Sequence, residues 1–457
     1  MNRLIVLLML AGCGSSDTDT DTDTDTDTDA EDADTDRPAA RPELPRVADL
    51  EDLDPADGEV RVRLVAAPAE LEVNGETVSG FAYNGQVPGP TLRLTRGDRV
   101  TAEIVNELDV PTTVHWHGLH VPNAADGSVW MREPIQPGAT ATVQFTVDQA
   151  GTFWYHPHFD TDRQVDLGLY GAIVVTDPDE PSVDEDIVVI GDTWGETGEG
   201  EEHGGPRLAG PWTLNGVEDP KLTLTAGSTA RLRWVNASNE GYLDLRPDDA
   251  WRWIGTDQGL IEPLAGAALL APGDRADLEV GVGAGETLVE IAPYSLFGGA
   301  VEDSGVVGSL QVMGEGTGSA PSLTDWGVID GPPLEDPGRT DLRFVFQGDG
   351  TRWFMNGEVF PDVTVPDVPV GSELFVEVRN VSPTEHPFHV HGHAFEVLSV
   401  NGERPRRRTL EDTVNVGIRD TLRLRMIADN PGEWMVHCHI LGHAEGGMMT
   451  VLRVVEP

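Results

Sequence analysis

The sequence is poor in cysteine and in basic residues. Its 457 residues include only two Cys, so at most one disulfide can form and bridges cannot be what holds the fold together. Lys and Arg number 30 against 79 Asp and Glu, a formal net charge of −49. Binding a polyphosphate needs a basic face, so the composition argues against a nucleic-acid partner and equally disfavours electrostatic docking on an anionic membrane.

Aromatic residues make up only 6% of the chain, whereas Gly (52) and Pro (33) are frequent. This mixture suits many strands joined by tight turns better than helical bundles. A single hydrophobic core stops growing near about 250–300 residues, so this length predicts two or three domains.

The N-terminus carries an apolar run that is too short to span a bilayer. Residues 1–12 hold one positive residue, Arg3, before the stretch Leu4 to Ala11, which is typical of a signal peptide. The run ends Leu10-Ala11-Gly12-Cys13, which resembles a bacterial lipobox and implies a lipidated Cys13 as the mature N-terminus. An ordinary signal peptide followed by a chance Cys is the alternative.

Residues 13–57 are predicted to form a disordered tether. From Asp17 to Asp29 the sequence alternates Asp and Thr, and it stays acidic to Asp36. Dense like charge without large apolar residues cannot offset the entropy of ordering, so an extended spacer is expected, with calcium binding as the alternative. The sequence thus predicts an exported protein held by a lipid anchor at the cell envelope, at the outer membrane, the periplasm or the cell surface.

Three repeats of one unit follow the tether. Each has an Asn-Gly pair, then a Gly 11 to 14 residues later, then an Asn nine residues further on: Asn84-Gly85, Gly97 and Asn106; Asn215-Gly216, Gly227 and Asn236; Asn356-Gly357, Gly371 and Asn380. Alternating segments such as 99–105 and 230–235 lie between them and read as half-buried antiparallel strands. An all-β chain of three sandwich domains is predicted, at 58–178, 179–330 and 331–457, with joints at 177–186 and 331–336 and a short helical turn near 442–448.

Histidines occur in four His-X-His pairs, which hold eight of the 13 His: His115/His117, His156/His158, His389/His391 and His437/His439. On a strand, residues i and i+2 project from one face, so each pair presents two imidazoles together. All four pairs fall in the first and third units. This distribution indicates a metal centre rather than scattered surface or core histidines.

The last pair encloses Cys438, whose side chain must point away from both imidazoles. His386 lies upstream, and His443 and Met448 lie downstream. Two His, one Cys and a weak axial Met form the ligand set of a blue-copper electron-transfer site. A buried structural Cys is the alternative.

Taken together, these motifs resemble the multicopper oxidase family in its three-domain, laccase-like form. The four signatures are His115-Trp116-His117-Gly118, Tyr155-His156-Pro157-His158, the segment His386 to His393, and His437-Cys438-His439 through His443 to Met448. They occur in family order, and with the repeats the resemblance covers roughly residues 58 to 457. It implies three cupredoxin-like Greek-key β-sandwiches and a reaction in which four one-electron oxidations of a donor reduce dioxygen to two waters.

The resemblance also implies four copper ions: one type 1, one type 2 and a type 3 pair. His386, Cys438, His443 and Met448 would hold the type 1 copper; His115 and His389 the type 2; His117, His156 and His439 one type 3; and His158, His391 and His437 the other. Electrons would arrive near an exposed His443 or His386 and pass through Cys438 to its neighbours His437 and His439. The middle domain would be a spacer without ligands, and a monomer would suffice.

Other histidines and methionines are assigned lesser roles. His393 is expected to pack near the ligands, His120 and His203 to lie at the surface, and Met449 to lie in the core. Two carboxylates match proton-relay positions of the family: Asp126, for which an exposed turn is the alternative, and Glu445. Many bacterial relatives carry Glu directly after the His that corresponds to His443, whereas this chain has Ala444 there and Glu445 one place later.

Methionine content and charge bear on the electron donor. Only nine Met occur, with no cluster beyond Met448-Met449, which lowers the case for Cu(I) as donor. Excess acidic charge is more often a solubility feature than a metal-ion site. Phenols or aromatic amines are therefore the first choice, and Cu(I), Fe(II) or Mn(II) the alternative. A non-catalytic copper-binding protein stays open as a different class.

Overall fold

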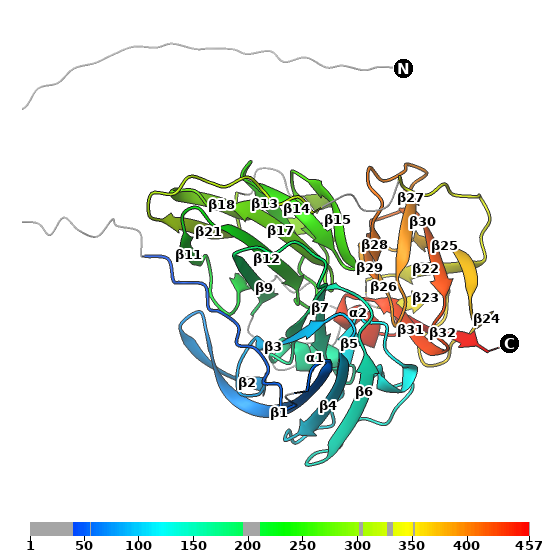
Figure 1. The fold of residues 1–457 in the computed structure, drawn as a ribbon. Helices are drawn as coiled ribbons and strands as arrows, with labels where there is room; N and C mark the ends of the chain where they lie inside the picture. The colour runs from blue at the N-terminus through cyan, green and yellow to red at the C-terminus, as the bar shows by residue number, and fades with distance from the viewer. Residues whose placement is uncertain are drawn as a thin grey trace, which may run out of the picture. The chain divides into compact units, whose positions relative to one another are not determined.

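The structure is a computed structural model that describes residues 40–54, 56–194, 211–300, 305–326, 332–350 and 352–456. The predicted signal peptide, Cys13 and most of the tether lie outside the described residues. The prediction of disorder is wrong for the described end of the tether: Leu44 is buried in the core of the second sandwich and bonds to the Lys221 carbonyl, and Leu50 bonds to the Thr91 carbonyl. Residues 41–457 form one compact unit. Within it, six sheets of four to six strands pair into three successive β-sandwiches, which confirms the all-β cupredoxin-like fold (Figure 1).

The first sandwich packs the sheet β2-β1-β4-β6 against β3-β8-β7-β5. Its elements are β1 (Glu59–Val73), β2 (Glu76–Tyr83), β3 (Gly89–Thr95), β4 (Arg99–Asn106), β5 (His115–His117), a 3₁₀ turn η1 (Asn123–Ala125), β6 (Thr140–Thr146), β7 (Gly151–His156), α1 (Thr161–Asp166) and β8 (Gly171–Thr176). On β4, Val100, Ala102 and Ile104 point into the core, as the predicted alternation requires. Burying such Val and Ile side chains stabilises the fold by about 1.5–3 kcal/mol each.

The second sandwich packs β10-β9-β12-β17-β14-β15 against β11-β21-β18-β13-β16, with the hairpin β19-β20 beside them. Its strands are β9 (Glu185–Thr193), β10 (Trp212–Leu214), β11 (Lys221–Thr225), β12 (Thr229–Asn236), β13 (Leu243–Pro247), β14 (Trp251–Thr256), β15 (Gly259–Leu264), β16 (Ala268–Leu270), β17 (Arg275–Gly281), β18 (Gly285–Ala292), β19 (Tyr294–Ser295), β20 (Gly299–Ala300) and β21 (Gly308–Glu315). The predicted joint at 177–186 is the connection from β8 to β9, although its last two residues already belong to β9.

The third sandwich packs β23-β22-β25-β30-β27-β28 against β24-β32-β31-β26-β29, the same topology as the second. Its elements are β22 (Leu342–Gly348), β23 (Trp353–Met355), β24 (Asp367–Pro369), β25 (Ser372–Asn380), β26 (His386–Val390), β27 (Phe395–Val400), β28 (Leu410–Glu411), β29 (Thr413–Val416), β30 (Thr421–Ala428), β31 (Gly432–Cys438), α2 (Leu441–Glu445) and β32 (Met449–Val455). The predicted helical turn is α2, which begins and ends slightly earlier than expected, whereas α1 was not predicted.

The repeated asparagines make equivalent hydrogen bonds in each sandwich. Asn106, Asn236 and Asn380 each donate two side-chain hydrogen bonds to carbonyls of neighbouring loops, and each accepts one from the backbone N–H two residues on. The Asn-Gly pairs place both residues at positive φ, for example 51° and 77° at Asn84 and Gly85, as tight turns that match the strand twist require. The sequence repeat is therefore a structural repeat.

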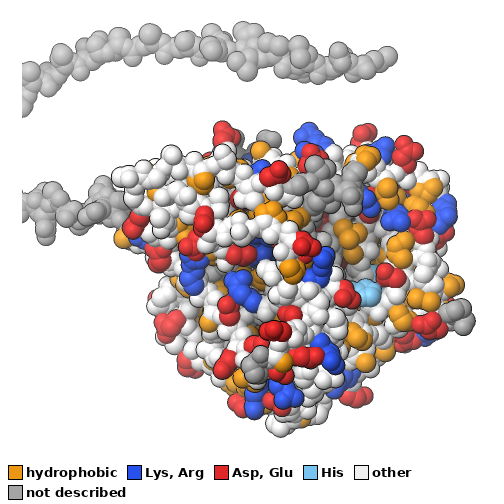
Figure 2. All heavy atoms as spheres, in the orientation of Figure 1, with side chains coloured by type: hydrophobic (Ala, Val, Ile, Leu, Met, Phe, Trp, Pro, Cys, Tyr) orange, Lys and Arg blue, Asp and Glu red, His pale blue; other side chains and the backbone are white. Residues whose placement is uncertain are grey.

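Acidic side chains are spread over the visible face of the molecule rather than gathered over one element (Figure 2). The folded body therefore carries many acidic side chains of its own. Among the described residues, no helix has the length and apolar character that crossing a membrane requires.

Candidate copper centres

Cys438 and two histidines meet at the end of the third sandwich. Cys438 ends β31, His386 begins β26, and His443 lies in α2. The Cys438 Sγ lies 3.4 Å from His386 Nδ1 and 3.8 Å from His443 Nδ1, and the two nitrogens are 3.1 Å apart. One ion between the three atoms would complete a His₂Cys trigonal site. Met448 is fully buried, and its backbone bonds to both Cys438 and His443, which keeps the predicted axial residue next to this site.

The expectation of an exposed histidine at this site is wrong in detail. His386 is completely buried, and its Nε2 is in hydrogen-bond contact with the hydroxyls of Ser382 and Thr384. His443 keeps 6% exposure and stacks on Trp353, with ring centroids 3.7 Å apart. Of the two ligands, His443 is therefore the one nearer to solvent.

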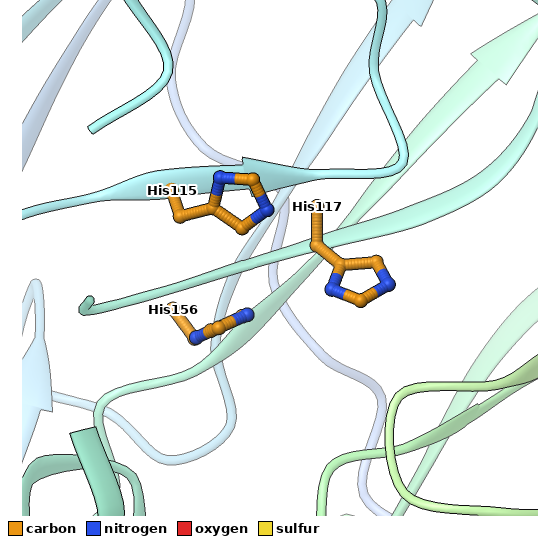
Figure 3. Close-up of side chains that lie close together, drawn as sticks. All are labelled: His115, His117 and His156. Atoms are coloured by element: carbon orange, nitrogen blue, oxygen red, sulfur yellow. The ribbon is translucent and has the colours of Figure 1, made fainter. Parts of the chain in front are cut away.

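The eight paired imidazoles converge between the first and third sandwiches. His115 is opposite His156 across the β5–β7 ladder, and His389 is opposite His437 across β26–β31. Figure 3 shows His115, His117 and His156 with their rings gathered in one space. His115 stacks on His391 of the third sandwich at 3.8 Å between centroids. The chain thus brings together side chains up to 324 positions apart in the sequence, from His115 to His439.

Six of these eight imidazoles have one nitrogen bonded outward and one that is left for a metal. The outward contacts, at 2.8–3.0 Å, are His115 Nδ1 to the Asp126 carbonyl, His156 Nδ1 to the Pro157 carbonyl, His389 Nδ1 to the Asp412 carbonyl, His437 Nδ1 to the Cys438 carbonyl, His391 Nδ1 to Asp126 Oδ2 and His117 Nε2 to Asp412 Oδ1. The inner nitrogens of His115, His117, His156, His389 and His439 are buried without any partner. Those of His158, His391 and His437 contact only one another, at 3.0–3.3 Å. Orphaned buried nitrogens of this kind fit metal ligation.

The geometry is compatible with the predicted division into three ions. His158, His391 and His437 form one group whose ligand atoms lie within 4.8 Å of one another, and His115 groups with His389. His117 groups with His156, and the His439 ring lies 4.9 Å from that of His117. His115 and His391 each belong to more than one such group, so the three sets lie next to one another.

Burial keeps these imidazoles in the form that binds metal. Desolvation lowers the pKa of His437 and His443 to about 3, and the pKa values of His156, His158 and His439 fall well below the usual range for the same reason. A neutral imidazole is the ligating form. Burial raises the pKa of the Cys438 thiol, so binding of a metal there must release the thiol proton.

Comparisons with known proteins agree with these centres. A family model described as multicopper oxidase matches residues 66–180 and another matches 333–457. The chain is 30% identical to the multicopper oxidase mco of Staphylococcus aureus over 84% of this chain and 85% of that protein.

The chain belongs to the multicopper oxidase family.

It is accordingly a laccase-like, copper-dependent oxidoreductase that couples oxidation of a donor to the reduction of dioxygen. Two solved structures are also similar. A laccase from Pediococcus acidilactici has 26% identity and a TM-score of 0.80 over 92% of this chain and 94% of that one. A metallo-oxidase from Campylobacter jejuni has 26% identity and a TM-score of 0.79 over 92% and 96%.

Asp126 of the oxidase is not an exposed turn residue. It follows η1, is 1% exposed, and accepts from His391 Nδ1 at 2.9 and 3.1 Å, while its carbonyl contacts His115 Nδ1. Burial works to raise its pKa, but His115, His158 and Ser128 together bring it below the ordinary value. Its carboxylate therefore touches two histidines assigned to different ions.

Glu445 of the oxidase lines a cavity of about 190 Å³ between α1 and α2. The same cavity is lined by His158 and His437, so it leads from Glu445 to the histidine cluster. The Glu445 carboxylate accepts the Asp162 N–H at 3.3 Å, and burial raises its pKa. Although Glu445 stands one place later than in many relatives, it faces the cavity that a relay residue would have to face.

Four minor assignments have mixed outcomes. His120 is exposed and contacts Asp429 at 3.3 Å, and His393 is buried with its Nδ1 against the His391 carbonyl, as expected. Met449 was expected in the core, but it is only half-buried and lines the cavity beside Glu445, because β32 begins there at the edge of the histidine cluster. His203 lies outside the described residues.

Sequence reasoning missed Asp412 and Arg275 of the oxidase. Asp412 is buried between β28 and β29 and bonds to His117 Nε2, and Arg275 of the second sandwich bonds to both Asp412 oxygens. Neither residue belongs to a histidine motif, and 137 positions separate them. No spacing in the sequence could have joined them.

Proposed function

We propose that this oxidase takes electrons one at a time from phenols or aromatic amines, beside His443, and carries four copper ions. Copper, when bound, supplies the one-electron chemistry and the binding of dioxygen. The observation that favours an organic donor is the packing around His443: its ring stacks on the buried Trp353 at 3.7 Å, and apolar surroundings of this kind suit an aromatic donor better than a hydrated metal ion.

The environment of the carboxylate nearest in sequence to the predicted type 1 ligands also favours an organic donor over a metal ion. Glu385 directly precedes His386, but Asn415 donates to it at 2.6 Å and Tyr294 at 3.0 Å. Burial raises its pKa, which disfavours the charged form that would attract Fe(II) or Mn(II). Oxidation of metal ions is the second candidate, and the metallo-oxidase among the similar structures makes it worth testing.

Cys438 is proposed to connect the two parts of the site. Its Sγ faces His386 and His443, while the side chains on either side of it in the chain, His437 and His439, point into the histidine cluster. An electron that reaches the thiolate therefore has only a few covalent bonds to cross. Asp126 and Glu445 are proposed to hold and pass the protons that oxygen reduction consumes.

Oxygen uptake tests the donor. The copper-loaded protein would be given a phenol, an aromatic amine, Fe(II), Mn(II) and Cu(I) separately, and kcat/KM would be compared. The organic donors are expected to give the higher values, and a tenfold preference corresponds to about 1.4 kcal/mol of transition-state stabilisation. A higher kcat/KM for any of the metal ions would reverse the proposal.

Replacing Glu445 by Gln is expected to lower the rate of oxygen reduction about tenfold, less than the ~10²–10⁴ typical of a sole general acid because cavity water can substitute in part. Stopped-flow reoxidation of the reduced enzyme would measure it. Glu433→Gln is a matched control, since Glu433 bonds to Arg453 and Trp130 and does not line the cavity. Equal rates for wild type and E445Q would remove Glu445 from the relay.

Export and anchoring are proposed from the N-terminal sequence alone. Labelled fatty acid should enter the protein in cells and should not enter a Cys13→Ser variant, and the wild type should fractionate with the envelope. Both halves of the histidine cluster come from one chain, which supports a monomer as a sufficient unit, to be measured by sedimentation. Copper analysis should return four ions per chain.

A further inference from the structure

The second sandwich contains none of the predicted ligands, yet it reaches the histidine cluster at a buried ion pair. Arg275, at the start of β17, has a side chain with no exposure and donates to both oxygens of Asp412, at 2.8 and 2.5 Å. Its other N–H groups donate to the carbonyls of Thr152, Gly273 and Asp257, each at 3.0 Å. Arginine has five N–H donors, and five bonds are made here, so the side chain is fully satisfied and fixed.

Asp412, which Arg275 holds in place, bonds in turn to two of the predicted copper ligands. Its Oδ1 contacts His117 Nε2 at 3.0 Å, and its carbonyl contacts His389 Nδ1 at 2.9 Å. The hydroxyl of the next residue, Thr413, contacts both of these ring nitrogens at 3.1 Å. Both carboxylate oxygens of Asp412 accept from Arg275, so Asp412 also acts as an acceptor toward His117. His117 therefore carries its proton on Nε2 and presents Nδ1 inward, the reverse of His115, His156 and His389.

Two glycines show how closely the sandwiches meet here. A Cβ on Gly118, which follows His117 and has φ +87°, would lie 2.6 Å from both Arg275 Nη2 and Asp412 Oδ2. A Cβ on Gly273 would lie 2.9 Å from the His439 ring. Gln258 of the second sandwich adds a bond from its Nε2 to Asp412 Oδ2 at 2.7 Å and another to the Gly118 carbonyl. Backbone and side chains of the second sandwich thus contact residues of both other sandwiches.

We infer that the second sandwich sets the geometry of the trinuclear copper site, with Arg275 as a positioning residue that acts through Asp412 on the tautomer of His117 and on the position of His389. The inference rests on the proposed four-copper arrangement and corrects the expectation that the middle domain is a spacer. Outer partners of metal ligands orient the ring and typically change metal affinity 10- to 100-fold when they are lost. Lysine cannot reproduce the bidentate contact of arginine with a carboxylate, so Arg275→Lys removes the geometry while keeping the charge.

The test compares Arg275→Lys with Arg233→Lys in the full-length, copper-loaded protein. Arg233 is a matched control because it is equally buried, bonds in the same forked way to Asp186 and also contacts Thr152. Its partner Asp186 bonds to Arg233 and Arg93, whereas Asp412 bonds to His117 and His389. Copper per chain would be measured after dialysis against a graded chelator, together with the blue absorption of the type 1 copper and the electron paramagnetic resonance of the type 2 copper.

Arg275→Lys is expected to keep the blue absorption but to lose type 2 and type 3 copper at about 10- to 100-fold lower chelator concentration than wild type, with an altered type 2 resonance. Arg233→Lys should match wild type. Equal copper loss in both variants, or none in Arg275→Lys, would overturn the inference. If Arg275→Lys does not fold, Gln258→Ala removes one bond to Asp412 without removing a charge and should show the same selective loss at smaller size; full retention there would overturn it too. A wild type that binds fewer than four coppers would instead contradict the proposed function.

Discussion

Replacing Cys438 by Ser is expected to abolish the blue absorption and to lower oxidase activity by more than about 100-fold, the upper end of losses for outer partners of a metal site, because a direct ligand is lost. Copper–thiolate bonding is the source of blue-copper character, and a hydroxyl is a hard ligand that copper does not accept in its place. The Sγ is fully buried and 3.4 Å from His386 Nδ1, so no other side chain can move in without rearranging β26 and β31.

Copper analysis of this variant should give three ions instead of four, because the histidine cluster keeps all eight imidazoles. The same substitution at the other cysteine, Cys13→Ser, is the matched control and should leave the colour and the activity of the folded body unchanged. A thermal unfolding curve checks that the buried Ser hydroxyl costs no more than about 1–3 kcal/mol. Persistence of the blue band in Cys438→Ser would refute the type 1 assignment.

Most of this site could be predicted from the local spacing of residues in the sequence. His437 and Cys438 end β31 and His439 follows directly, so local alternation was enough to predict that the thiol faces one side and the two imidazoles the other. The repeated Asn and Gly positions mark the same turn and loop contacts in each sandwich, and they could be found by comparing the sequence with itself. Ligands that lie on regular strands next to such markers are therefore readable from the sequence.

The same repeat shows which residue of the second sandwich stands where the third sandwich has a ligand. Asn236 and Asn380 are 144 positions apart, and with this offset Ser238 corresponds to Ser382 and Tyr242 to His386. Ser238 and Ser382 make equivalent hydrogen bonds to their asparagines. Tyr242 instead donates to Asn415 of the third sandwich. The two sandwiches share one strand topology, but the position that holds a predicted ligand in the third makes an interface contact in the second.

The contacts between sandwiches could not be predicted from the sequence. The ion pair of Arg275 and Asp412 joins β17 to the β28–β29 connection, and no periodicity links positions so far apart. The same holds for the exposure of His386 and His443, which depends on Trp353 and Ser382 packing around them. The sequence did not predict which of these residues are buried, because burial depends on how the assembled sandwiches pack and not on any single strand.

Replacing Asp126 by Asn is expected to slow reoxidation of the reduced enzyme by dioxygen about 10²- to 10⁴-fold, the range for loss of a positioned proton-transfer group. The amide oxygen can still accept from His391 Nδ1, so the ligand geometry is largely kept while the ability to carry a proton is lost. Reduction of the type 1 copper by the donor under anaerobic conditions should keep its wild-type rate, because Asp126 has no recorded contact with His386, Cys438 or His443.

Stopped-flow measurements of both half-reactions across pH separate these effects. The ionised form of Asp126 takes up a proton only as pH falls toward its lowered pKa, so wild-type reoxidation should slow as pH rises, while Asp126→Asn should be slow throughout. Asp148→Asn is the control, since Asp148 is an exposed carboxylate between β6 and β7. Copper content must be equal in the two variants. Full-rate reoxidation of Asp126→Asn at every pH would place the proton supply elsewhere, with Glu445 and its cavity as the remaining route.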